Sequence, residues 1–140
     1  MHMSVRFLVS AFIFTATACG SSTGTNYGGG SNPPASCAGT GASATIDATA
    51  GASASSFTFS PNAATITAGQ SVCWVNNSIA DHTVTSGAGT TDDGTFPARS
   101  LFKGTTVVVT FATAGSYPFH CSIHLPPTYT NMTGTITVNP

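Results

Sequence analysis

Short runs of β-branched and aromatic residues, separated by Gly, Pro and Asn, recur along most of this 140-residue chain. Side chains of an extended strand point alternately to two faces, and several runs alternate apolar with polar residues accordingly. No stretch has the 3.6-residue apolar period of an amphipathic helix. The pattern predicts an all-β fold, an antiparallel Greek-key β-sandwich. The expected strands cover residues 45–48, 56–59, 64–67, 71–76, 82–85, 105–111, 116–121 and 133–139.

Strand alternation also gives the direction of three residues that are able to bind metal. Cys121 has the parity of Phe119, and Met132 has the parity of Ile136. His82 is in phase with the next apolar residue of its own strand. All three are therefore expected to point into the sandwich, close to strand ends.

A fourth such residue, His124, lies three positions after Cys121, and seven residues separate it from Met132. With His82, the four side chains supply one thiolate, two imidazoles and one thioether. Sulfur ligands favour Cu(I), whereas imidazole binds both oxidation states, so this set suits a blue-copper electron-transfer centre. His82, Cys121, His124 and Met132 are therefore the candidate metal ligands.

Between about residues 57 and 138 the chain resembles the cupredoxin family, in its plastocyanin-, pseudoazurin- and halocyanin-like branch. The most specific part of the resemblance runs from the Gly115-Ser-Tyr-Pro-Phe-His-Cys121-Ser-Ile-His124 stretch to Met132-Thr-Gly-Thr-Ile-Thr-Val138. Supporting motifs are Phe59-Ser-Pro, Gly69-Gln-Ser-Val-Cys-Trp74-Val-Asn-Asn, Asp81-His82-Thr-Val and Gly104-Thr-Thr-Val-Val-Val-Thr-Phe111.

This resemblance implies a cupredoxin-like fold with one type 1 copper ion held by His82, Cys121, His124 and Met132. It also implies a monomer, not an enzyme, that carries single electrons between redox proteins such as cytochrome c-like proteins or copper and haem oxidoreductases. Two departures stand out. Plastocyanin-like members have about four residues between the loop histidine and the methionine, and Thr83 here replaces an Asn that usually follows the first histidine.

Other functions for the same residues remain open. A copper storage, delivery or resistance protein would use the same ligands. Multicopper oxidases and nitrite reductases need further histidines, and residues 19–140 contain only His82, His120 and His124. A hydrolase built on Cys121 and His124 lacks a clear third orienting residue. A methionine ligand argues against zinc.

The N-terminus has the features of an export signal. Residues 1–18 combine Arg6 with an apolar stretch too short to span a bilayer and a small-residue cleavage site before Cys19. We expect lipidation of Cys19, a lipid-anchored Gly/Ser-rich tether over residues 19–40, and a copper-binding domain over residues 41–140. The protein would then be held in the bacterial periplasm or outer membrane by lipid alone. Cleavage without lipidation would instead give a soluble periplasmic protein.

Charge and cysteine content narrow the interpretation further. Residues 19–140 carry two basic and four acidic side chains, which disfavours nucleic-acid binding. If Cys19 carries lipid and Cys121 binds metal, Cys37 and Cys73 remain for a possible disulfide, which an exported chain tolerates. The alternative is that Cys73 is simply a small buried residue of an apolar strand.

The remaining assignments concern surfaces. His120 adjoins Cys121, so alternation directs its side chain away from the metal, and we expect it to be exposed and dispensable. Trp74 is in phase with Val72 and is expected in the core. The apolar loop residues beside His124 are expected to form the docking surface for redox partners. They are Leu125, Pro126, Pro127 and Tyr129.

Overall fold

A computed structural model describes residues 34–50 and 56–140 of the protein. Within these residues the chain forms nine strands and no helix. Accordingly, the described part of the chain offers no helical segment with the length and apolarity needed to cross a membrane. The strands are β1 (Ala44–Ala50), β2 (Phe57–Ser60), β3 (Ala63–Thr67), β4 (Ser71–Asn76), β5 (His82–Ser86), β6 (Arg99–Leu101), β7 (Thr106–Thr110), β8 (Gly115–His120) and β9 (Thr133–Asn139).

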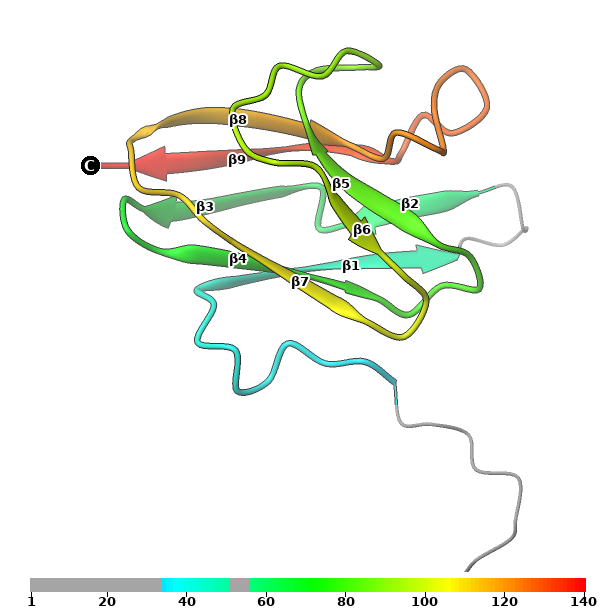
Figure 1. Ribbon diagram of the computed structural model, residues 1–140, viewed down its shortest axis with the longest axis horizontal. Coiled ribbons are helices and arrows are strands. Elements are labelled where there is room, and N and C mark those ends of the chain that lie inside the picture. The colour runs from blue at the N-terminus through cyan, green and yellow to red at the C-terminus, as the bar shows by residue number, and fades with distance from the viewer. Residues whose placement is uncertain (1–33, 51–55) are drawn as a thin grey trace, which may run out of the picture. The chain divides into compact units, whose positions relative to one another are not determined.

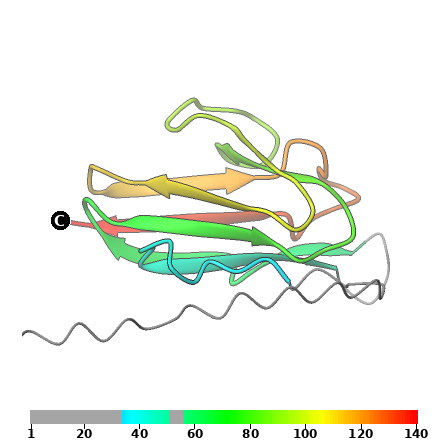
Figure 2. The ribbon, with the colours of Figure 1, turned by 60° about the horizontal axis from the view of Figure 1, so that its bottom comes forward.

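The strands form two sheets that face each other as the layers of a sandwich (Figures 1 and 2). One sheet has the order β2-β1-β4-β7 and the other has the order β3-β9-β8-β5-β6. The predicted all-β sandwich is confirmed, but each sheet is mixed, because β1 pairs with β4 and β3 pairs with β9 in parallel. Apolar alternation sets which face a side chain occupies and carries no information on strand direction, so the sequence did not indicate these pairs.

Aromatic side chains join the two layers. Phe119 of β8 lies edge-to-face against Phe59 of β2 and Trp74 of β4, with ring centroids 5.3 and 5.4 Å apart. Trp74 is fully buried, as expected from its phase with Val72. Aliphatic residues from both sheets, such as Ile136, fill the space around these rings. Edge-to-face pairs at these distances stabilise a core beyond the area that they bury.

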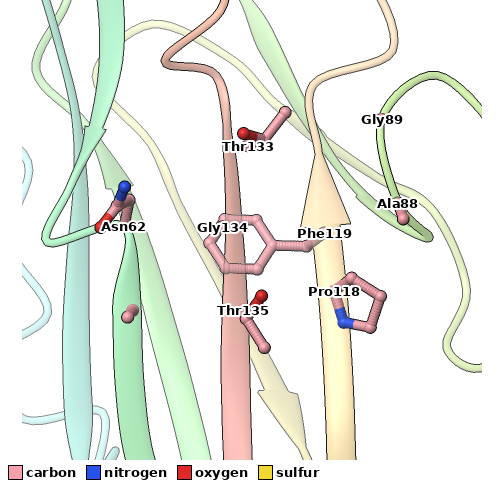
Figure 3. A pocket seen from close by; sticks show the side chains of 9 residues that line it. Asn62, Ala88, Gly89, Pro118, Phe119, Thr133, Gly134 and Thr135 are labelled. Carbon is pink, nitrogen blue, oxygen red and sulfur yellow. The ribbon is translucent and has the colours of Figure 1, made fainter.

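Gly134 shows how closely β9 packs against its neighbours in the same sheet (Figure 3). A Cβ atom at this position would collide with the backbone oxygen of Asn62 and with the ring of Phe119. The same Asn62 oxygen accepts a hydrogen bond from the Thr135 amide at 3.0 Å. Only glycine allows β9 to approach the turn before β3 this closely.

β4 is buried on both of its faces, in contrast to its neighbours. Its outer face carries Cys73, which forms a disulfide with Cys37 (S–S 2.02 Å, Cα–Cα 6.0 Å). This disulfide joins the two cysteines for which the sequence suggested a possible cross-link. The cross-link holds the segment before β1 across this face, and Cys73 is fully buried as a result.

The predicted strands match the observed ones within two residues at each end, but the sequence analysis missed β6. Its three residues, Arg-Ser-Leu, are too few and too polar to show alternation. β6 forms because it pairs with β5, where Leu101 lies opposite His82. Figure 1 shows that the loops after β4, β6 and β8 gather at one end of the sandwich, on the right of the view.

Candidate metal centre

Strand pairing brings the candidate ligands together at this end. β8 runs antiparallel to β5, with His120 opposite Thr85, so the chain beyond β8 lies beside the start of β5. His82 is the first residue of β5, and Cys121 directly follows β8. His124 lies in the loop between β8 and β9. The topology thus joins one strand-borne and two loop-borne residues at a single point.

Three ligand atoms converge there. The Nδ1 atoms of His82 and His124 are 3.0 Å apart, and the Cys121 Sγ atom lies 3.8 and 3.6 Å from them, respectively. A triangle with sides of 3.0, 3.6 and 3.8 Å has a circumradius of about 2.0 Å, which is close to ordinary metal–nitrogen and metal–sulfur bond lengths. The three side chains are therefore placed to hold a metal ion.

The surroundings keep the two imidazoles neutral. Burial, and secondarily the nearby His124, lowers the pKa of His82 from 6.5 to about 4, against a smaller opposing effect of Asp81. Burial also lowers the pKa of His124. Neutral imidazole is the form that binds metal, so both rings are ready to act as ligands at neutral pH. Cys121 is fully buried and is the free cysteine among the described residues.

Met132 lies directly opposite Cys121. Its side chain is fully buried, and its carbonyl oxygen accepts a hydrogen bond of 2.9 Å from the Cys121 amide. The seven-residue segment after His124 therefore forms an outward loop and returns the chain to the metal centre. The longer loop therefore does not separate the backbone of Met132 from that of Cys121.

Thr83 links the two ligand segments where an Asn was expected. Its amide points at the Cys121 Sγ atom over 3.4 Å. Its hydroxyl oxygen accepts a 2.7 Å hydrogen bond from the Ser122 amide and lies 3.0 Å from the Ser122 hydroxyl. A second hydroxyl, from Thr85, donates to the Thr83 oxygen at 3.0 Å. The bonds to Ser122, the residue after Cys121, hold the cysteine beside the start of β5.

Aromatic rings enclose the two histidines on another side. Phe57, at the start of β2, contacts both His82 and His124 edge-to-face, with centroids 4.9 and 4.7 Å away. Tyr129, from the loop, contacts His124 at 4.7 Å and stacks on Phe57 at 5.8 Å. The sequence analysis did not identify Phe57 as a site residue, because the contact depends on the way β2 packs under the loop. Ser78, which lies 2.7 Å from the other ring nitrogen of His82, was likewise missed.

The interpretation of His120 needs one correction. Its side chain is separate from the group formed by His82, Cys121 and His124, but it is buried, not exposed. Its Nδ1 atom lies 3.0 Å from the carbonyl oxygen of Gly87. The turn after β5 covers this side of the sheet, and the pattern of β8 alone contains no sign of that cover.

The surface of the ligand loop also differs in detail from the expectation. Leu125, Pro126 and Tyr129 are half-buried, and Pro127 is exposed. The most exposed large apolar side chain of the loop is Ile123, at 57%. Ile123 lies between Cys121 and His124, and the sequence contains no signal that distinguishes its exposure from that of these two more buried residues.

Two hollows elsewhere offer less chemistry. A hollow of about 410 Å³ beside β9 is lined by Asn62, Phe119 and Thr133 to Thr135, among others (Figure 3). None of its described lining residues is titratable. Another, of about 520 Å³, lies between Pro34 and the loop after β4 and includes Lys103.

Cys19, the predicted lipidation site, lies outside the described residues.

Comparisons with known proteins agree with this geometry. Residues 46–139 match the family described as copper binding proteins, plastocyanin/azurin family. An amicyanin from Paracoccus versutus is 35% identical over 60 residues, which cover 43% of this chain and only 46% of that protein.

Solved structures show the same fold. A purple cupredoxin from Nitrosopumilus maritimus superposes with a TM-score of 0.56 at 24% identity, over 69% of this chain and 99% of that chain. A reduced amicyanin variant superposes with a TM-score of 0.52 at 23% identity, over 71% and 84% of the two chains.

Proposed function

The chain belongs to the plastocyanin/azurin family of copper-binding proteins, and from this premise we propose that it carries single electrons on one type 1 copper ion. In this proposal Cys121, His82 and His124 supply the three strong ligands, and Met132 supplies a weak axial one. The protein acts as a carrier and not as an enzyme.

The convergence of two Nδ1 atoms and one thiol sulfur is the observation that supports this function best. The group of His82, Cys121 and His124 includes no carboxylate, and two of its three members are buried. Thiolate and imidazole ligands in a dry site favour copper over Mg²⁺ or Ca²⁺, which prefer oxygen. The buried methionine next to Cys121 adds a soft donor that zinc sites do not use.

Bound copper would supply a one-electron Cu(II)/Cu(I) couple at this site. The chain's own contribution is to hold the ligand atoms in place, so that a change of charge requires little movement. The Thr83 amide directs its N–H at the Cys121 sulfur and stabilises negative charge there. His124 is half-buried, so its ring connects the buried centre with the surface.

Adding Cu(II) to the purified protein tests the proposal. We expect an intense visible absorption band and a blue-copper EPR spectrum at one copper per chain. Cys121→Ser should abolish the intense band, because thiolate-to-copper charge transfer produces it. Met132→Leu should retain copper and raise the reduction potential, since a donor that stabilises Cu(II) is lost. An unchanged band in Cys121→Ser would refute the assignment.

The same preparation separates electron transfer from copper storage or delivery. A carrier should cycle reversibly between its two oxidation states and keep its metal when mixed with a copper-free acceptor. A delivery protein would instead lose copper stoichiometrically to that acceptor.

We further propose that redox protein partners dock on the surface of the ligand loop. Leu125, Pro126, Pro127 and Tyr129 would contribute to it, together with Ile123. The described residues carry few charges, so steering by charge should contribute little to encounter. The proposed partners are cytochrome c-like proteins or copper or haem oxidoreductases.

The place of action in our proposal is outside the cytoplasm. Export of the chain, lipidation of Cys19 and a tether over residues 19–40 would hold the copper domain at a bacterial membrane by lipid alone. Mass spectrometry of the mature N-terminus tests this directly. A lipid-modified Cys19 is the expected result, and an unmodified one would leave a soluble periplasmic carrier.

A further inference from the structure

A buried polar chain lies behind the metal centre, on the side of His82 that faces away from the other ligands. The Nε2 atom of His82 is 2.7 Å from the Ser78 hydroxyl oxygen. Ser78 and His82 are 2% and 1% exposed, and Asn76, the next residue in the chain of contacts, is fully buried. Polar groups this deeply buried are costly unless each finds a partner.

The bonds of Asn76 establish the direction of the hydrogen bonds. Its Nδ2 atom donates to the carbonyl oxygens of Ala80 and Leu101 at 2.8 and 2.9 Å. Its Oδ1 atom must therefore face Ser78, where it accepts from the amide at 3.0 Å and from the hydroxyl at 2.8 Å. The single hydroxyl hydrogen of Ser78 thus has acceptors at Asn76 Oδ1 and at the Ala80 carbonyl oxygen, 2.8 and 3.1 Å away. One lone pair of the Ser78 oxygen accepts from the Ala80 amide at 3.2 Å, and the other is left to accept from His82.

We propose that Ser78 is a positioning residue for the metal centre. By accepting a hydrogen bond from Nε2–H, it holds His82 in the tautomer whose Nδ1 lone pair points at Cys121 and His124. Asn76 in turn fixes the hydroxyl of Ser78. The proposal rests on the function proposed above, but it concerns groups that do not themselves touch metal.

The inference also assigns the proton between the two histidines of the metal-free protein. Their Nδ1 atoms are 3.0 Å apart, a hydrogen-bond distance that requires one donor. If Ser78 holds His82 as the Nε2–H tautomer, the donor is His124. Among the described residues, the Nε2 atom of His124 has no comparable protein partner, so its tautomer is free to adjust.

The tautomer can be read directly from ¹⁵N NMR of the histidine side chains in metal-free protein at pH 7.5. We expect His82 to be fully in the Nε2–H form and His124 to carry its proton on Nδ1. Ser78→Ala should shift His82 to a mixture of tautomers. Observation of Nδ1–H on His82 in the unaltered protein would overturn the proposal, whether or not the variant folds.

A matched control exists in Ser86. Its side chain is as buried as that of Ser78 and also makes a hydrogen bond, to the Phe96 carbonyl at 3.0 Å, but none of its hydrogen bonds in the described part of the chain involves a histidine. Ser86→Ala should lower stability by a similar amount and leave the His82 tautomer unchanged. Equal tautomer populations in the two variants would refute a positioning role for Ser78.

Copper affinity gives a second readout. Ser78→Ala should weaken copper binding about 10- to 100-fold, as is typical when the partner of a metal-binding histidine is removed. Ser78→Thr, which keeps the hydroxyl, should restore most of the affinity, and Ser86→Ala should bind as the unaltered protein does. Loss in Ser78→Ala no larger than in Ser86→Ala would count against the proposal. If the unaltered protein bound no copper, the proposed function would fail, whereas the tautomer measurement would still test Ser78.

Discussion

The two histidines of the metal centre offer the same imidazole nitrogen to the same sulfur, at nearly equal distances, from opposite kinds of structure. His82 begins a paired strand and is buried, with Leu101 opposite it and Ser78 behind it. His124 lies on a surface loop and is held mainly by ring contacts with Phe57 and Tyr129. One half of the site is thus part of the core, and the other half rests on it.

This contrast separates two demands on the protein. The strand-borne half depends on long-range pairing and on a polar network that must be complete, so a change there affects folding as well as metal binding. The loop-borne half needs only the contacts of the His124 ring with Phe57 and Tyr129, and a loop that returns the chain to β9 at Met132. Loop length can therefore vary more freely, which explains how this chain accommodates seven residues between His124 and Met132.

Removing each imidazole should expose the largest difference. In metal-free protein, His82→Ala should lower the free energy of unfolding by about 2–5 kcal/mol, because it opens a buried cavity and leaves the Ser78 network short of a donor. His124→Ala should cost about 1 kcal/mol or less, since it removes only partly exposed ring contacts. Urea denaturation of the two variants measures both values.

The control for this comparison is copper binding, which both substitutions should impair. Equal losses of stability in the two variants would break the contrast between the halves. A larger loss in His124→Ala would reverse it and would show that the loop stabilises the sandwich.

Acid should affect the strand-borne half more than the loop. The pKa of His82 is lowered from 6.5 to about 4, chiefly by burial, so the unfolded chain binds more protons than the folded chain between these values. The contribution of His82 to stability is therefore complete above about pH 6.5 and declines as the pH falls toward 4. Denaturation midpoints of metal-free protein at pH 7, 6, 5 and 4.5 should decrease in that order. His82→Ala should flatten this dependence of the midpoint on pH. If His124→Ala flattened it as much, the effect would belong to the loop and the prediction would be wrong.

Substitutions on the surface of the ligand loop should have the smallest effect on stability and the clearest effect on the rate of electron transfer. Ile123→Asp should leave the copper spectrum and the unfolding midpoint nearly unchanged, because the side chain is 57% exposed. It should slow electron transfer with a partner protein, since a charge must then be desolvated on docking. Stopped-flow kinetics at several salt concentrations measures this, and the unaltered protein should show a weak salt dependence.

Val108 supplies the matched control for Ile123. It is 41% exposed, but it belongs to β7 in the opposite sheet and not to the ligand loop. Val108→Asp should leave the rate of electron transfer unchanged. Equal slowing by both substitutions, or a steep dependence on salt, would place recognition elsewhere.

The sequence was sufficient to predict the features that depend on the alternation of apolar and polar side chains along a strand. It predicted the all-β sandwich and most strands, and it directed His82, Cys121 and Met132 inward, where the structure buries all three. Each of these predictions follows from a residue's position within its own strand. The cysteine count was similarly informative, because few pairings were possible.

Features that depend on neighbouring strands could not be predicted in this way. Burial of His120 comes from the turn that bears Gly87, and β6 exists because β5 lies beside it. A serine in a short loop has no distinctive sequence pattern, so only the packing of the loop against β5 reveals the contact of Ser78 with His82. Tertiary packing, and not local propensity, determines all three.

The disulfide between Cys37 and Cys73 has a mechanical consequence. A pull on the chain from its N-terminal side passes through Cys37 into the middle of β4 and does not reach the first residues of β1. β4 is flanked by β1 and β7, so the force would have to shear two rows of backbone hydrogen bonds at once, and could not peel one strand from an end. Without the cross-link, the same pull would act on β1 directly. The disulfide at Cys37, seven residues before the start of β1 at Ala44, thus directs tension to β4 in the interior of its sheet and not to the end of β1.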